Sequence, residues 1–491
     1  MGTKNRKLIR SYKRNKQAHR MAKTVFQLIV TASIMLLIFF TSPLTSWTTT
    51  AAQPLPEEEP LTLGMIADLA KPAVVQIGTD YSTTVSAPDW GRNTELLQQD
   101  LEILADENDD IDLDDEQVVA EQTEALFWTD PLKYMVPTEA PRSTQSITSS
   151  MGSGFIVTPD GYIVTNAHVV RPDVQIEDFL VQDAIMNFIL EDLELVFADV
   201  EREQALQDII QAQQSGTYLY LSEQGAALVQ AVTDFYLNQY NLGAILLGDI
   251  QSDIYASTRV SIPGVAESEN WINAEIIPSA TGEPTPGKDV AVLKIEGSNL
   301  PTLPLGDETT LQSLDNIIAI GFPAIVGQAF QGQGVEPSIT SGQLSGFQTT
   351  PGGWRAIQVQ TPISGGNSGG PALDISGRVV GVATFGVVDP ITGEASQSHN
   401  FLVPVSIVKD FLNRANVIPS EGVFTQMYRQ ALIHYSAGRY NEAIDILQQI
   451  NNISPNNPYV LDYISRSQAQ LGSTARGITG NSTDGIGNFT Q

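Results

Sequence analysis

The chain has 491 residues, 42 % of them apolar, which is enough for roughly two to four globular domains. It contains no cysteine, so a disulfide framework, a thiolate zinc site and a cysteine nucleophile are excluded. The formal net charge is −30, although residues 4–23 hold nine Lys or Arg and no acidic residue, so residues 24–491 carry about −39. This acidity argues against a nucleic-acid partner.

The N-terminal region is typical of an exported protein. Residues 1–24 form a basic tail, residues 25–41 an uncharged and mostly apolar run, and residues 42–60 a linker. A basic tail before an apolar run predicts that the tail stays in the cytoplasm and that the rest of the chain lies outside it. Two outcomes remain open: an uncleaved transmembrane anchor, or a signal segment cleaved near the small residues at 50–52, which would leave a secreted chain.

Residues 91–130 are predicted to form a mobile acidic loop. The stretch from Asp106 to Glu116 contains no basic residue. A calcium loop of the EF-hand type needs a glycine at its sharp turn and a glutamate at its twelfth position, and this stretch provides neither. We therefore interpret it as a solvated acidic run, and we predict no metal and no other cofactor for the chain.

His168 follows an apolar segment that reads Gly-Tyr-Ile-Val-Thr-Asn-Ala-His-Val-Val from residue 161. The segment predicts a strand that ends in a short turn. Such a turn would hold the imidazole in a fixed position, as a general base requires. A lone histidine after a strand is more often structural, so its interpretation depends on partners further along the chain.

Residues 172–245 are predicted to be a helical insertion. Apolar residues recur at helical spacing from Phe179 to Ala198 and again from Ala226 to Leu237. Two interpretations remain open. The insertion is either a helical hairpin packed on itself or a lid that controls access to a site beside His168.

Two later segments supply the partners of His168. Asp289 opens the apolar strand Val-Ala-Val-Leu-Lys-Ile, and Ser368 lies in the motif Gly-Asn-Ser-Gly-Gly-Pro, which begins at Gly366. Glycine allows backbone conformations that a β-carbon forbids, and the amides of Gly366 and Ser368 can then receive an oxyanion. The order His168, Asp289, Ser368 is that of the chymotrypsin-type catalytic triad.

Together these motifs resemble those of the HtrA/Deg branch of trypsin-like serine proteases. The resemblance covers residues 61–79, 150–170 and 286–412. It is carried by the segments Lys71–Ile77, Gly152–Val157, Gly161–Val170, Asp289–Ile295, Leu305–Asp307, Ala319–Pro323, Ile339–Gly342, Gly366–Pro371 and Gly377–Val382.

The resemblance implies a mainly β protease domain over residues 61–412, built as a chymotrypsin-like double β-barrel with the triad between the barrels. It implies an oxyanion hole in the turn Gly366–Asn367–Ser368, protein or peptide substrates, and a homo-oligomer, since relatives form trimers. The walls of the substrate pocket are expected to include Ile363, Ala383, Thr384, Phe385 and Phe401, none of which is charged, so small or medium apolar substrate side chains are expected before the cleaved bond.

The chain also departs from this family. Gln360 stands where relatives carry an aspartate. His168 and Asp289 are 121 residues apart, against a few tens in relatives, because of the insertion. The PDZ domain that usually follows the protease domain has no evident counterpart.

In its place, residues 420–471 are predicted to form helices that resemble a tetratricopeptide repeat. Small residues at Ala431, Gly438 and Ala443, followed by Pro455, fit the two-helix pattern of that repeat. The alternative is a plain helical hairpin. The tail at 472–491, rich in Gly, Ser, Thr and Asn, is predicted to be disordered.

The sequence thus predicts an extracytoplasmic serine endopeptidase that cleaves misfolded or exported proteins. In this mechanism Ser368 attacks, His168 transfers protons and Asp289 orients the ring. The alternative is a gated or inactive scaffold with a protease fold, which would bind protein partners through its C-terminal helices.

Overall fold

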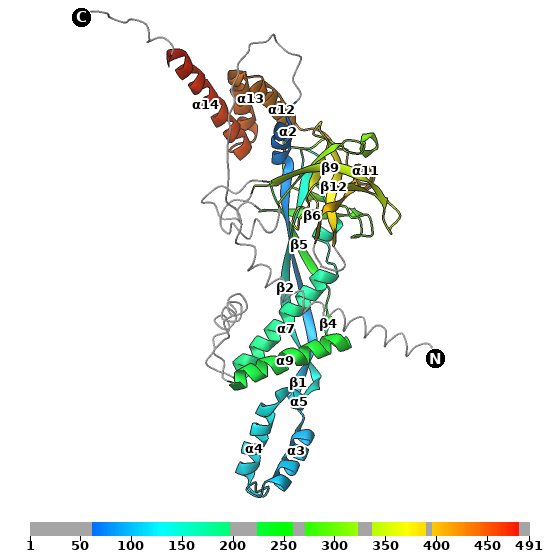
Figure 1. Cartoon of the computed structure of the whole chain (residues 1–491), viewed down its shortest axis with the longest axis vertical. Coiled ribbons are helices and arrows are strands. Elements are labelled where there is room, and N and C mark those ends of the chain that lie inside the picture. The colour runs from blue at the N-terminus through cyan, green and yellow to red at the C-terminus, as the bar shows by residue number, and fades with distance from the viewer. Residues whose placement is uncertain (1–60, 197–222, 259–270, 323–335, 389–394, 481–491) are drawn as a thin grey trace, which may run out of the picture. The chain divides into compact units, whose positions relative to one another are not determined.

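The computed structural model describes residues 61–196, 223–258, 271–322, 336–388 and 395–480 (Figure 1). The predicted basic tail, apolar segment and linker all fall within residues 1–60 and lie outside the described residues. In the described part of the chain, no helix is both long enough and apolar enough to cross a bilayer.

The chain divides into two compact units, and each is described by itself. The barrel unit consists of Gln53–Tyr81, Ser149–Asp173 and Ser252–Gln491. The helical unit includes Ser82–Thr148 and Val174–Gln251. The predicted acidic loop and the predicted helical insertion therefore belong to one unit, separate from the barrels, rather than being two independent additions to a protease domain.

One sheet of the barrel unit closes on itself. It is a six-stranded antiparallel barrel in the order β10-β13-β12-β11-β8-β9. Runs of consecutive apolar residues are buried in its strands. In β8, for example, every residue from Ile317 to Gly321 is buried. The strands are β8 (Asn316–Gly321), β9 (Ser338–Thr349), β10 (Arg355–Val359), β11 (Pro371–Leu373), β12 (Val379–Val388) and β13 (Ala395–Pro404).

The second sheet has the order β2-β3-β7-β6-β5-β1-β4, and an additional pairing of β2 with β1 completes a ring. Strands β1 and β2 are long and continue from the barrel unit into the helical unit. The two sheets confirm the mainly β, chymotrypsin-like prediction. The strands are β1 (Val74–Arg92), β2 (Met135–Ile156), β3 (Tyr162–Thr165), β4 (Leu246–Leu247), β5 (Gln251–Ser257), β6 (Trp271–Thr281) and β7 (Ala291–Ile295).

Helices flank the sheets of the barrel unit. Apolar side chains of the helix before β1 and of the helix after β13 join the large core that the two sheets share. The helix after β13 ends at Arg414, close to the predicted end of the protease domain at 412. These elements are α2 (Leu63–Ala70), the 3₁₀ turns Lys71–Ala73 and Glu308–Thr310, α6 (Ala167–Val170) and α11 (Val405–Arg414).

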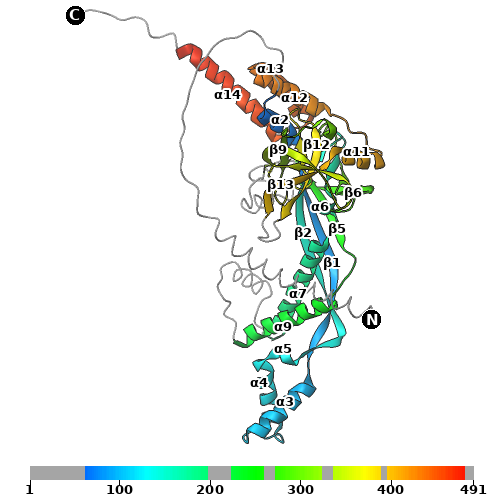
Figure 2. The ribbon, with the colours of Figure 1, turned by 45° about the vertical axis from the view of Figure 1, so that its right-hand side comes forward.

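The acidic segment is helical, so the prediction of a mobile loop over 91–130 was wrong. It contains α3 (Thr94–Glu107) and α4 (Glu116–Thr129), which lie side by side (Figures 1 and 2), and α5 (Pro131–Tyr134) follows it. The acidic side chains from Asp106 to Glu116 are exposed, as a solvated run predicts, and one of them also caps a helix. Asp115 accepts hydrogen bonds from the amides of Gln117 and Val118 in the first turn of α4.

The insertion contains the two predicted helices, α7 (Val174–Val196) and α9 (Glu223–Leu242). They pack on each other through a core that includes Phe188 and Tyr236, whose rings are 5.1 Å apart between centroids. The same core includes Leu97 and Phe127 from the segment 82–148, so the two helices pack on that segment as well as on each other. Phe179 and Leu237, counted on the apolar faces in the sequence, are 51 % and 43 % exposed.

Three C-terminal helices follow one another: α12 (Val423–Ser436), α13 (Tyr440–Ile453) and α14 (Pro458–Gly480). Ala431 and Ala443 are fully buried in their packing, as the repeat pattern requires, but the tetratricopeptide assignment remains a prediction. The predicted disorder from residue 472 was wrong up to Gly480, because α14 continues through this stretch, which contains no proline. Residues 481–491 lie outside the described residues.

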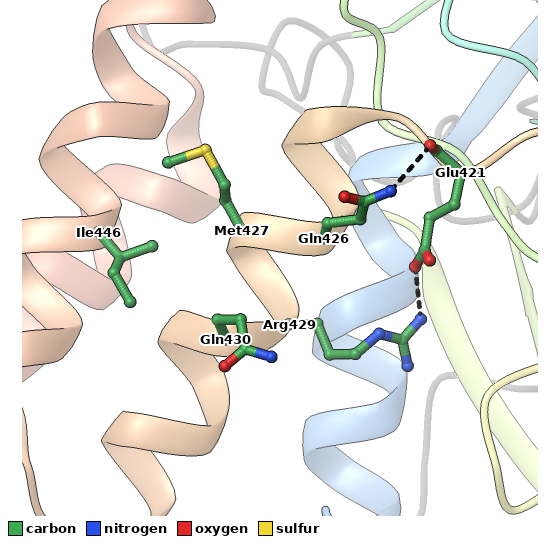
Figure 3. A pocket seen from close by; sticks show the side chains of 6 residues that line it. All are labelled: Glu421, Gln426, Met427, Arg429, Gln430 and Ile446. Carbon is green, nitrogen blue, oxygen red and sulfur yellow. Dashed lines mark hydrogen bonds and ion pairs between the residues drawn. The ribbon is translucent and has the colours of Figure 1, made fainter.

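A groove of about 530 Å³ opens on α12 and α13 (Figure 3). Arg429 and Glu421 form an ion pair of 2.8 Å at one side of it, and Met427 and Ile446 supply apolar surface. None of the candidate catalytic residues lines this groove. Its lining is Glu421, Gln426, Met427, Arg429, Gln430 and Ile446.

A buried ionic cluster joins the two insertions within the helical unit. Arg142 of β2 contacts Asp192 and Glu191 of α7, at 2.6 Å each, and donates to the hydroxyl of Tyr236 on α9 at 3.0 Å. Asp192 is 4 % exposed and also accepts a hydrogen bond from the Trp90 indole at 2.8 Å. The cluster satisfies charges that would be costly to bury alone.

Replacing Arg142 with alanine should destabilise the helical unit by about 3–5 kcal/mol, because the Asp192 carboxylate would lose its cation inside the protein. Arg92→Ala is the matched control, since Arg92 pairs with Glu124 at the surface, and it should cost about 1 kcal/mol or less. Urea unfolding with hydrogen exchange of the helical unit measures both. Equal losses in the two variants would contradict the structural role of the cluster.

Candidate active site

His168 is held by the junction between β3 and α6. The strand ends at Thr165, and the one-turn helix α6 begins one residue before the histidine. The side-chain amide of Asn166 donates to the Asp289 carbonyl at 2.6 Å, which joins this junction to the segment before β7. The ring of His168 is 29 % exposed, so one side of it remains open.

Asp289 is buried, and its carboxylate has three donors. Oδ2 lies 2.7 Å from Nδ1 of His168 and accepts from the Thr384 hydroxyl at 2.6 Å. Oδ1 accepts from the backbone N–H of His168 at 3.0 Å. Burial favours the neutral carboxyl, but these bonds outweigh it and hold the pKa of Asp289 below its ordinary value. The group is therefore an anion against the imidazole.

The contact with Asp289 also determines the direction of the pKa shift of His168. Burial by itself lowers the pKa of the imidazole, but the hydrogen bond and the charge of Asp289 outweigh it, so the pKa of His168 lies above its ordinary value of 6.5. With Nδ1 held by the carboxylate, the proton of neutral His168 resides on Nδ1 and leaves Nε2 free to accept another proton.

Ser368 stands on a tight turn between two glycines in the left-handed region, Gly366 (φ 94°) and Gly369 (φ 86°). The turn is tied down by its own backbone. The Gly370 N–H donates to the Asn367 carbonyl at 3.0 Å, and the Gly369 N–H donates to the Ala383 carbonyl of β12 at 2.8 Å.

Two amides of this turn are unused. Neither the Gly366 N–H nor the Ser368 N–H donates a hydrogen bond to any described residue. They are the two groups that the sequence predicts for an oxyanion hole. Asn367, between them, is 4 % exposed, and its Oδ1 has no partner among the described residues.

The Ser368 hydroxyl donates to the backbone carbonyl of Thr384 at 3.0 Å. Within the described residues it makes no hydrogen bond to His168. Thr384 therefore contacts both Ser368 and Asp289: its carbonyl accepts from the Ser368 hydroxyl, and its own hydroxyl donates to the Asp289 carboxylate. The sequence prediction placed Thr384 in the pocket wall and missed this role, because only the position of β12 relative to Asp289 reveals it.

The remaining predicted pocket residues do not line one common surface. Ala383 is fully buried in the core of the closed barrel and offers no wall, which corrects its assignment. Ile363 packs partly buried against that same core, whereas Phe401 packs against the larger core. Phe385 pairs with Phe401 along β12 and β13, and its side chain lies outside what the structure describes.

Replacing Asp289 with asparagine should lower the pKa of His168 below 6.5, because an amide does not stabilise the imidazolium and burial then dominates. Titration of the imidazole by NMR measures the shift. Asp374→Asn is the control, since Asp374 serves only its own turn by accepting from Ser376 and Arg378. An unchanged His168 titration in the Asp289 variant would contradict the contact.

Comparison with known proteins agrees with this geometry. The family model described as "Trypsin-like peptidase domain" matches residues 152–287 and 260–382. The chain is 29 % identical over 194 residues to the serine endoprotease DegS of Haemophilus influenzae, covering 38 % of this chain and 53 % of that protein. It is 39 % identical over 100 residues to a DegP-like periplasmic serine endoprotease of Pseudomonas putida, covering 20 % of this chain and 19 % of that protein.

Among solved structures, the HtrA-type protease AlgW with a decapeptide is 17 % identical and covers 72 % of this chain and 68 % of that one. The TM-score of 0.34 is too low to establish a shared arrangement of the whole chain. The chain spans about half the length of the DegS relative and less of the DegP-like one. From its motifs, its two β sheets and the family match, the chain carries a trypsin-like peptidase domain, and it is similar to serine endoproteases of the DegS and DegP type.

Proposed function

We propose that the chain is a serine endopeptidase of HtrA type that cleaves proteins or peptides through an acyl-enzyme. One observation carries this proposal. A buried carboxylate contacts Nδ1 of a partly exposed histidine, and the same unit presents a serine on a glycine turn with two unused amides. A general base, a nucleophile and an oxyanion hole are the parts that acyl transfer needs.

In the proposed reaction Ser368 attacks the peptide carbonyl while Nε2 of His168 takes the hydroxyl proton. Asp289 keeps the ring in the correct tautomer and offsets its positive charge. The imidazolium then gives its proton to the leaving amine. Water, activated by His168, hydrolyses the acyl-enzyme and restores the Ser368 hydroxyl.

The Ser368 hydroxyl must turn from the Thr384 carbonyl toward Nε2 of His168 for this reaction. The Ser368 side chain is only partly buried, and its hydroxyl can rotate about the bond between Cα and Cβ. Catalytic hydrogen bonds are often long or misaligned before a substrate binds. The amides of Gly366 and Ser368 would stabilise the oxyanion of the tetrahedral intermediate.

The proposal extends to cellular location and assembly. Export of the protease domain is supported by the basic and apolar N-terminal sequence and by the periplasmic DegP-like relative. We propose that the apolar run anchors the chain in the membrane, with secretion after signal cleavage as the alternative. A trimer and the cleavage of misfolded or exported proteins are proposed from the HtrA/Deg resemblance.

A second candidate function is a gated protease-fold scaffold that binds protein partners through its C-terminal helices. The observation that favours it is the Ser368 hydroxyl bonded to Thr384 rather than to His168. The groove on α12 and α13 would then be the working surface. Chemical reactivity of Ser368 separates the two candidates.

Ser368→Ala should abolish labelling by a fluorophosphonate and reduce casein cleavage by about 10⁴-fold or more, because the nucleophile is removed. Peptide mapping of the labelled wild-type protein should place the adduct on Ser368. Ser376→Ala is the control: Ser376 lies in the turn held by Asp374, and its loss should leave labelling unchanged. A wild-type protein that never labels or cleaves would favour the scaffold.

A peptide library should show preference for small or medium apolar residues before the cleaved bond. The reason is that no charged side chain is among the residues predicted to form the pocket walls, Ile363, Phe385 and Phe401. Mass spectrometry of the products measures the preference. A dominant preference for glutamate or arginine at that position would contradict the prediction.

A further inference from the structure

Ser153 lies at the end of β2 and is fully buried. Its hydroxyl donates to the carbonyl of Gly366 at 2.7 Å and accepts from the N–H of Phe322 at 2.8 Å. Its backbone N–H donates to the carbonyl of Ser368 at 2.8 Å. One residue of the first sheet therefore binds two carbonyls of the nucleophile turn.

These two carbonyls flank the amides that matter for acyl transfer. The peptide unit that carries the Ser368 N–H lies between the Gly366 and Ser368 carbonyls, and both of these are fixed by Ser153. The carbonyl of Asn367 is taken by Gly370 within the turn. With the carbonyls engaged by the protein, the amides of Gly366 and Ser368 are the groups left for a ligand.

Close packing makes this arrangement specific to the Ser153 side chain. A β-carbon on Gly321 would lie 2.9 Å from Ser153 Oγ and 3.0 Å from Asn367 Oδ1. A β-carbon on Gly369 would lie 2.1 Å from the Ser153 carbonyl. Such packing leaves no space for a substituting water, so loss of the hydroxyl would leave the Gly366 carbonyl and the Phe322 N–H without partners.

We propose that Ser153 is a positioning residue that holds the turn Gly366–Asn367–Ser368 with both amides directed at the oxyanion. The inference rests on the proposed peptidase function and adds a group that does not touch the substrate. Its hydroxyl fixes the Gly366 carbonyl, and the left-handed φ of Gly366 then sets the direction of the preceding amide. The rotation of this peptide unit determines whether the oxyanion has two donors or one.

Ser153→Ala tests the inference. Loss of a complete oxyanion donor lowers kcat by about 10²–10³-fold, so a misdirected donor should lower kcat by about 10–100-fold while KM changes by no more than about twofold. Affinity for a peptide boronate, which places a tetrahedral oxygen in the hole, should fall by a factor similar to that of kcat. Affinity for the amine product, the peptide that follows the cleaved bond and places no oxygen in the hole, should stay within about twofold.

Ser467→Ala is the matched control, since it removes another buried serine hydroxyl, which donates to the Tyr463 carbonyl within α14; its kcat should equal that of the wild type. If Ser153→Ala does not fold, Ser153→Cys leaves a weaker hydrogen-bonding group in the place of the hydroxyl and should show the same pattern.

The outcomes separate this inference from the proposed function. A wild-type protein that is labelled on Ser368 together with an alanine variant of unchanged kcat and boronate affinity would overturn the role of Ser153 alone. Parallel losses in product and boronate affinity would also overturn it, because they indicate a general structural defect. A wild-type protein that neither labels nor cleaves would overturn the peptidase proposal and this inference with it.

Discussion

The candidate site depends on the burial of the Asp289 carboxylate. Water is excluded from it, so the anion is tolerated only because the ring and backbone of His168 and the hydroxyl of Thr384 replace the lost solvent. These donors come from both sheets: His168 follows β3 of the first, and Thr384 lies on β12 of the closed barrel. One side chain thus sets the position of the base relative to the barrel that carries Ser368.

Because Asp289 and His168 interact, the pH range in which their contact stabilises the fold most differs from the range in which His168 can act as a base. The lowered pKa of Asp289 contributes stability that is present above about 3.9 and is lost as the pH falls through the folded value. The raised pKa of His168 contributes stability that is complete below about 6.5 and is lost as the pH rises through the folded value. A general base must be neutral, so catalysis requires a pH at which the second contribution has declined.

The sequence predicted well what local pattern controls. The strand before His168, the strand after Asp289 and the glycine turn at Ser368 all have their predicted form, because apolar runs and glycines act within a few residues. Thr384 and Ser153 could not be assigned in this way, since each acts through a partner more than 90 residues away. The acidic segment was predicted to be a loop because its many charges were given more weight than its helix-capping residues. Asp115 is acidic, and it is also the N-cap of α4.

The helical unit shows why each insertion could not be understood alone. Leu97 and Phe127 from the first insertion share a core with Phe188 and Tyr236 from the second. Arg142 of the first insertion neutralises Asp192 of the second. Either insertion by itself would expose apolar side chains and leave a buried charge unpaired, so neither forms a stable core without the other. The two interruptions of the trypsin-like domain, 82–148 and 174–251, are therefore one structural addition encoded in two pieces.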